Sequence, residues 1–270
     1  MGPWLEAATA AALAGSSAGF VWGFYDPRHE PWAAGALAAA WLFTTAWLVG
    51  VVDLPSPSLT TPAVVGNMVV WTAVAGFPWW SRRPGWAPLA GFAVPVLTLV
   101  WVMSQVVDPR APAVAAWHPL WGWVHLGLLA VAITSLLLGA AGAGMYLEHE
   151  RELLHKTPRL FYYRLPPLGD LDRWSYRLTV LGWAGLSGSM ASGLMAEPAG
   201  VYWVQAIGGA GMLAVWLLYL AYVVLRARGW RGHGSSWLTV AAFVALAAAV
   251  VGAGSASYSV AAVAWHSLCA

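Results

Sequence analysis

Histidines are the side chains of this sequence best suited to chemistry, because a neutral imidazole is the commonest metal ligand in proteins. Seven are present, and they form two groups. Those in or beside charged connections are His29, His149, His155 and His233. Those next to long apolar stretches and among tryptophans are His118, His125 and His266. We interpret the first group as interfacial or solvated, and we look for a cofactor site in the second.

The spacing of the histidines in the second group is compatible with a shared cofactor site. His118 precedes His125 by seven residues, so two helical turns would place both on one face if the helix begins early. Trp121 lies between them, and Trp265 directly precedes His266. Flat aromatic rings can pack against a porphyrin, but tryptophan is also the residue expected at membrane interfaces. The tryptophans alone therefore fit both a cofactor site and a membrane boundary.

The elements that position these residues are predicted to be membrane helices. The chain has 270 residues, of which 60% are hydrophobic and 9% are charged. A soluble domain has about a quarter charged residues. Crossing the hydrocarbon takes about 20 apolar residues. We predict an all-α polytopic membrane helix bundle with about eight transmembrane helices. They run over residues 4–24, 33–52, 59–79, 86–107, 120–147, 176–195, 201–225 and 236–260.

Basic residues gather in alternate connections. Of the 13 lysines and arginines, all but Arg110 lie in the first, third, fifth and seventh connections. The positive-inside rule places these connections in the cytoplasm and both termini outside. This topology explains the arginines beside the spans, so we expect no nucleic-acid surface.

The longest connection, 148–174, is charged and contains prolines. It separates a five-helix part, 1–147, from a three-helix part, 175–270. We predict one membrane domain over 1–270 with a cytoplasmic loop, rather than two soluble domains.

Within this loop, the segment EHERELLHK is predicted to extend the fifth helix. Pro166 and Pro167 then interrupt it. Asp172 is predicted to cap a short approach to the sixth helix.

The sixth helix carries small residues on one face. Gly185, Ser189 and Gly193 recur every four residues, a pattern that lets membrane helices approach closely. A substrate groove along this stripe is the alternative. No charged side chain lies deep in a predicted span, which argues against ion-coupled transport.

Depth estimates bring two histidines to the same side. His125 lies about 8 Å into the fifth helix, and His266 lies about 44 Å beyond Trp237 if the eighth helix is unbroken. Both then reach the outer side of the membrane. The sequence allows a shared ligand site there, or histidines that are simply hydrogen-bonded to neighbouring helices.

Several stretches together resemble the CcsA and HemX family of cytochrome c assembly membrane proteins. The resemblance covers residues 117–270. The stretches, in chain order, are HPLWGWVHL, MYLEHER, RLPPLGDLDRWSYR, RGWRG and YSVAAVAWHS.

The resemblance implies a haem-handling protein of the bacterial plasma (inner) membrane. In the CcsA branch, a second membrane subunit assists, and haem is moved outward and presented to apocytochrome c. By position, His125 and His266 would be the bis-histidine axial ligands of a haem b. The further residues expected to contact the cofactor are His118, Trp121, Trp203 and Trp265.

One departure favours the HemX branch. The family's tryptophan-rich outer segment ends in Trp-Asp, whereas residues 196–209 keep only Tyr202 and Trp203 of that pattern. The first four spans also contain no histidine that could act as an inward-side ligand. The HemX branch is linked by resemblance to haem biosynthesis and to control of glutamyl-tRNA reductase abundance.

We therefore predict a haem-binding membrane protein that holds or passes haem at the outer face for cytochrome c biogenesis. One alternative is a HemX-like regulator that acts through a cytoplasmic partner of the loop. Another is a transporter or structural subunit without a cofactor. We find no nucleotide loop, paired buried carboxylates or Ser-His-Asp arrangement, so we expect no independent catalysis, although a part in a haem-attachment complex stays open.

Overall fold

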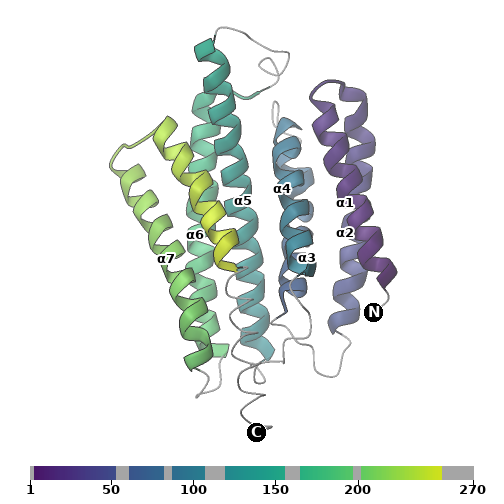
Figure 1. The fold of residues 1–270 in the computed structure, drawn as a ribbon, viewed down its shortest axis with the longest axis vertical. Coiled ribbons are helices and arrows are strands. Elements are labelled where there is room, and N and C mark those ends of the chain that lie inside the picture. The colour runs from purple at the N-terminus through teal and green to yellow at the C-terminus, as the bar shows by residue number, and fades with distance from the viewer. Residues whose placement is uncertain are drawn as a thin grey trace.

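The computed structural model describes residues 3–52, 61–81, 87–106, 119–155, 165–196 and 202–250. Within these ranges the chain is helical and contains no strand, which confirms the all-α prediction. The labelled elements are α1 (Pro3–Gly23), η1 (Pro27–His29), α2 (Glu30–Val52), α3 (Pro62–Ser81), α4 (Ala87–Val106), α5 (Pro119–His155), α6 (Leu168–Ala196) and α7 (Tyr202–Ala227). A further helix, His233–Val250, follows α7 and is the yellow-green ribbon of Figure 1.

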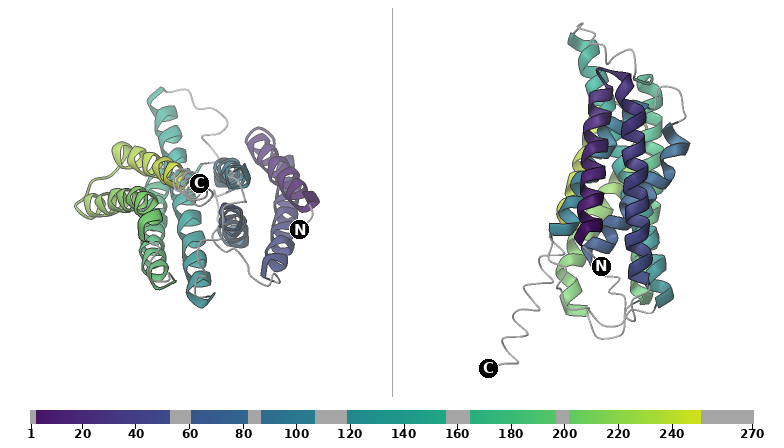
Figure 2. Two further views of the ribbon diagram at one scale, coloured as in Figure 1. Left: turned by 60° about the horizontal axis from the view of Figure 1, so that its bottom comes forward. Right: turned by 90° about the vertical axis from the view of Figure 1, so that its right-hand side faces the viewer.

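The helices run up and down as one bundle (Figure 1). At one side lie α1 and α2, and at the other lie α7 and helix His233–Val250, with α5 between them (Figure 2). Helix α5 packs against α3, α4 and α6, and its interface with α6 is the most extensive in the labelled helices. The fold is therefore organised around α5, the helix that carries His125.

Five described helices are long and apolar enough to cross a membrane, so the chain is a multi-pass membrane protein. They are Pro27–Val51, Pro88–Val106, Leu120–His155, Ala210–Ala227 and His233–Val250. In helix Leu120–His155, 67% of the most apolar 18-residue stretch is buried inside the protein, whereas the corresponding share in the other four helices is 22–39%. The central helix thus packs mainly on protein, whereas the others turn much of their apolar surface outward, where lipid replaces protein.

Glycines bring α5 and α6 close together. A Cβ atom added at Gly182 would lie 2.5 Å from Cγ of Leu136, and one at Gly185 would lie 3.0 Å from Cβ of Ala132. A side chain at Gly182 would collide with Leu136 and one at Gly185 would press on Ala132, so the two glycines let the helices approach closely. Gly185 of the predicted small-residue stripe thus packs on α5, as the packing interpretation expects.

The connection between α5 and α6 differs from the prediction at one end. Helix α5 continues to His155, as predicted for the segment after residue 147. Helix α6 begins at Leu168, because the amides of Asp170 and Leu171 already bond the Pro167 carbonyl oxygen at 2.9 and 3.1 Å. The prediction that Asp172 caps the helix is therefore wrong. Asp172 lies inside α6, and its carboxylate pairs with Arg226.

One buried amide side chain joins two helices. The indole Nε1 of Trp101 on α4 donates to Oδ1 of Asn67 on α3 at 3.2 Å. Asn67 itself donates to the Ala63 carbonyl one turn earlier at 2.8 Å. Asn67 is 1% exposed, so this bond satisfies a polar group in the interior, where water is absent.

Candidate functional site

The structure describes two of the six predicted site residues completely, His125 and Trp121, both near the start of α5. Trp203 lies in the first turn of α7, and its side chain is outside the described atoms. The other three, His118, Trp265 and His266, lie outside the described residues. The proposed pairing of His125 with His266 therefore stays a prediction.

His125 lies in the second turn of α5 and is half-buried against α6. Its Nδ1 atom is 2.7 Å from the carbonyl oxygen of Ser189. A carbonyl oxygen can only accept a hydrogen bond, so Nδ1 carries the proton and donates. In the neutral imidazole, the lone pair is then on Nε2. The contact with α6 thus selects the nitrogen that is able to bind a metal.

The face of α6 that meets this ring consists of Ser189 and Gly193, one turn apart. A Cβ atom added at Gly193 would lie 3.0 Å from Nδ1 and 3.2 Å from Cε1 of His125. The Ser189 hydroxyl lies 3.2 Å from Nδ1 of His125 and 3.3 Å from the carbonyl oxygen of His125, to which it donates. The backbone oxygen of each residue therefore accepts a bond from the side chain of the other.

The opposite side of this segment is apolar. Leu126, next to His125, is 3% exposed and belongs to a cluster formed with α1, α2 and α3. The buried members of that cluster are Leu5, Trp47, Val51, Val64 and Leu126. Trp123 is partly buried and packs against it, and Trp121 is also partly buried. The first turns of α5 are thus fixed on two sides, by polar contacts to α6 and by apolar contacts to the N-terminal helices.

The described donor set is compatible with an axial ligand of haem. Among the described residues, no group of three or more His, Cys, Asp or Glu side chains could hold a metal. A structural or catalytic metal ion usually needs such a set. Haem iron needs only axial ligands from the protein, because the porphyrin supplies the equatorial nitrogens. A single oriented histidine in an apolar, tryptophan-containing setting matches this requirement.

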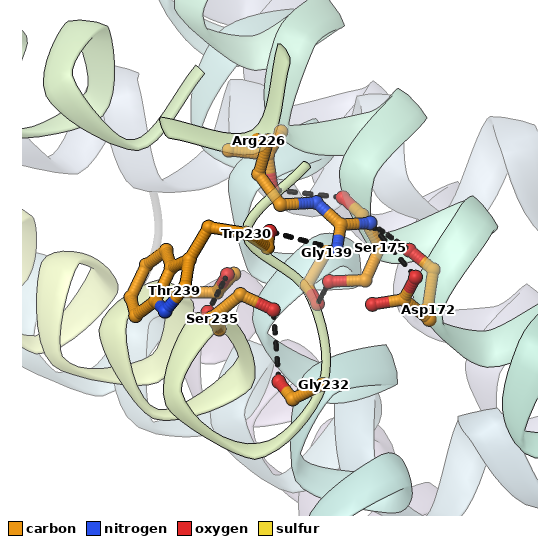
Figure 3. A network of polar contacts seen from close by, with 9 residues as sticks. Gly139, Asp172, Ser175, Arg226, Trp230, Gly232, Ser235 and Thr239 are labelled. Carbon is orange, nitrogen blue, oxygen red and sulfur yellow. Dashed lines mark hydrogen bonds and ion pairs between the residues drawn. The ribbon is translucent and has the colours of Figure 1, made fainter. Parts of the chain in front are cut away.

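The other end of the α5–α6 pair contains a buried ion pair that the sequence analysis missed (Figure 3). Nη2 of Arg226 is 2.9 Å from Oδ2 of Asp172 and 3.3 Å from its carbonyl oxygen. Nη1 of Arg226 lies 3.4 Å from the Trp230 carbonyl oxygen, and the guanidinium carbon lies 5.1 Å from the Tyr176 ring centroid. The Arg226 side chain is 4% exposed. In the sequence, Arg226 served only as one of the arginines that set the topology. The signal that could have identified the pair is an acidic residue early in one helix followed by an arginine late in the next.

The ion pair is accompanied by two further contacts between helices. The Ser175 hydroxyl donates to the Gly139 carbonyl oxygen at 2.8 Å, joining α6 to α5 (Figure 3). Nδ1 of His233 lies 2.6 Å from Oε2 of Glu150, joining helix His233–Val250 to α5. Each of these groups is used in a contact between helices, so we assign this end a structural role. We call it the Arg226 end of the bundle and the opposite one the His125 end.

Comparisons with known proteins agree with the resemblance in the sequence. Residues 37–258 match the model of a family described as "Cytochrome C assembly protein". Proteins named "Cytochrome c biogenesis protein CcsA" from two strains of Heterosigma akashiwo are 23% identical over 189 residues. The match covers 56% of this chain and 59% of each relative, so the chain spans about three fifths of the length of these relatives. No solved structure matches. The expected HemX branch is not confirmed by these relatives.

Proposed function

Because this chain belongs to the family of cytochrome C assembly proteins, we propose that it binds haem b at the His125 end and holds it for cytochrome c biogenesis. His125 and His266 are the proposed axial ligands. The family match and the CcsA names of the relatives support the assignment to this process.

The observation that carries the proposal is the hydrogen bond from Nδ1 of His125 to the Ser189 carbonyl oxygen, 2.7 Å long. Metal-binding histidines almost always donate their other ring N–H to a carboxylate, a backbone carbonyl or water. Such a bond fixes the tautomer and the direction of the ring. Helix α6 gives His125 this orientation through its own backbone, which supports a role as a ligand rather than as a helix-packing residue alone.

Each residue has a limited task in this proposal. Nε2 of His125 binds the iron, and Ser189 holds the opposite nitrogen. Trp121 borders the site, and His118, Trp203 and Trp265 are the further residues expected beside it. Bound haem would supply the iron and the vinyl groups that become attached to a client apocytochrome. The chain itself binds and orients, and a second membrane subunit and the apocytochrome are the expected partners.

The proposed site faces outward. The sequence places the basic connections, including the one at the Arg226 end, in the cytoplasm. The His125 end is then the outer face, and both termini lie outside a bacterial plasma membrane. This orientation would present haem on the side where c-type cytochromes are assembled.

The test is an absorption spectrum of detergent-purified protein, oxidised and reduced, for the wild type and for His125→Ala and His266→Ala. We expect a bis-histidine b-type spectrum in the wild type and loss of stoichiometric haem in both variants. The control is His233→Ala, which removes an exposed histidine at the Arg226 end. A wild type that binds no added haem would refute the proposal, and full spectra in both variants would refute the ligand assignment.

The alternative function is that of a HemX-like regulator that binds a cytoplasmic partner. It is favoured by the sequence of residues 196–209, which lacks the Trp-Asp ending of the haem-presenting branch. Deletion of residues 156–164 would then abolish partner binding and leave any haem spectrum unchanged. A cofactor-free transporter or structural subunit predicts no haem in any variant.

A further inference from the structure

We propose that α6 is the positioning element of the haem ligand, through the Ser189 carbonyl oxygen and the absence of a side chain at Gly193. The inference rests on the proposed function, since it concerns the same histidine. It assigns two residues of α6 that do not touch the cofactor but determine how His125 meets it.

The first part of the device is the hydrogen bond. The Ser189 carbonyl oxygen accepts from Nδ1 of His125 at 2.7 Å and also from the Ser192 hydroxyl at 3.0 Å. A backbone acceptor on a buried helix has a fixed position, so the ring is oriented by the fold. A donated Nδ1–H also raises the basicity of the opposite nitrogen. The strength of this bond should therefore set the electron density at Nε2.

The second part of the device is the close approach of the His125 ring to α6 at Gly193. The ideal Cβ position at Gly193 lies 3.0 Å from Nδ1, 3.2 Å from Cε1 and 3.9 Å from Cγ of His125. The edge of the ring that contains Nδ1 thus lies directly against the backbone of α6. A methyl group at this position would have to displace the ring by a few tenths of an ångström. Any such displacement acts first on the bond to Ser189, because Nδ1 is the nearest atom.

The same helix face supplies a matched control. A Cβ atom at Gly185 would also meet α5 at 3.0 Å, but the atom it meets is Cβ of Ala132. Gly185→Ala and Gly193→Ala therefore both strain the α5–α6 interface, the first against the Cβ and backbone of Ala132 and the second against the His125 ring. Only Gly193→Ala touches the ligand. If the two variants differ in the properties of bound haem, the difference reports the positioning of His125. If both lose stability, that shared loss reports the packing of α5 on α6.

The experiment compares purified wild type, Gly193→Ala and Gly185→Ala. For haem-loaded protein, the measurements are the haem dissociation constant, the low-spin g values by electron paramagnetic resonance, and the midpoint potential. For haem-free protein, the measurement is the His125 tautomer from nitrogen-15 chemical shifts of labelled histidine. We expect Gly193→Ala to weaken haem binding about tenfold, as for other orienting groups of metal ligands. Its g values should shift, its potential should rise because the ligand becomes less basic, and Gly185→Ala should match the wild type.

Ser192→Ala provides a test that does not depend on how well Gly193→Ala folds. It removes a hydroxyl whose single proton is shared between the carbonyl oxygens of Gly188, at 2.9 Å, and Ser189, at 3.0 Å. The bond from His125 to the Ser189 carbonyl oxygen should then strengthen, and the midpoint potential should fall. The two variants are thus expected to shift the potential in opposite directions. Equal potentials and g values in Gly193→Ala, Gly185→Ala and wild type would overturn the inference, as would a higher midpoint potential in Ser192→Ala.

Failure of the proposed function gives a different result. A wild type that binds no haem refutes haem binding itself. The haem-free tautomer measurement would then still report whether Nδ1 of His125 is protonated in the wild type and perturbed in Gly193→Ala. If haem binds through His125 and Gly193→Ala leaves the properties of the bound haem unchanged, only the positioning role is refuted.

Discussion

At each end of the α5–α6 pair, a serine of α6 donates a hydrogen bond to a backbone carbonyl of α5. Ser175 bonds the Gly139 carbonyl oxygen at 2.8 Å, and Ser189 bonds that of His125 at 3.3 Å. The two serines are fourteen residues apart, and so are the two acceptors, so about 21 Å separates the contacts along the helices. Equal spacing on two antiparallel helices means that both bonds enforce one register.

The chemistry around the two contacts differs. The Arg226 end has an ion pair between a buried arginine of α7 and a partly buried aspartate of α6, so opposite charges join these two helices. The His125 end has a neutral imidazole that uses one nitrogen for packing and has its lone pair on the other. The comparison indicates that a serine-to-carbonyl bond maintains the register at both ends, and the proposed haem ligand lies at one of them.

The largest expected effect concerns the ion pair. Asp172→Ala leaves the buried Arg226 guanidinium without its carboxylate. Because the Asp172 side chain is 19% exposed, we expect a loss below the value of about 3–5 kcal/mol for one partner of a fully buried pair. We expect a large loss of stability in denaturant titration in detergent, with a normal haem spectrum in the folded fraction. The control is the double variant Asp172→Ala/Arg226→Met, which removes both charges and should recover much of the loss. Loss of haem from folded Asp172→Ala protein would contradict the assignment of a structural role to the Arg226 end and of haem binding to the His125 end.

A smaller effect is expected from the two serines. Ser175→Ala and Ser189→Ala should each lower the free energy of unfolding by about 0.6 kcal/mol, the typical value for a hydrogen bond between membrane helices. The haem spectrum should persist in both, because Ser189→Ala keeps the carbonyl oxygen that holds His125. Loss of haem in Ser189→Ala alone would show that the hydroxyl, rather than the backbone, orients the ring.

The smallest effect is expected at the edge of the Arg226 end. His233→Ala removes the contact with Glu150, in which the histidine side chain is 62% exposed. Exposed ion pairs contribute about 0–1 kcal/mol. We expect a change close to the error of a denaturant titration, and Glu150→Gln should behave in the same way. A loss comparable to that of Asp172→Ala would assign this pair a larger role in joining helix His233–Val250 to α5.

The fold was largely predictable because apolar length is a local signal. The second helix was predicted over 33–52 and is found as Glu30–Val52. The start of α6 was placed too late because its first turns contain Asp170, Asp172 and Arg173, so the hydropathy falls while the helix continues. Hydropathy predicts which residues lie in the membrane, and it does not predict where the hydrogen bonds of a helix begin.

The residues of the candidate site were identified by their type, and their contacts were not predicted. His125 was identified by its position among apolar residues, and the stripe containing Ser189 and Gly193 was identified by its spacing. Their meeting depends on the register between α5 and α6, which apolar helices do not encode in their periodicity. For the same reason, counting arginines on alternate sides gave the topology but could not pair Arg226 with Asp172.

The group that holds His125 is a backbone oxygen, and this has a consequence for the divergence of related chains. Residue 189 can change during evolution while the acceptor stays in place, since every amino acid has a carbonyl. At position 193 the constraint is an upper limit on size, because even a methyl group would touch the ring. A search for a shared side chain would therefore pass over the residue that orients the histidine. The trace of this function in related sequences would be a position where nothing larger than glycine is tolerated.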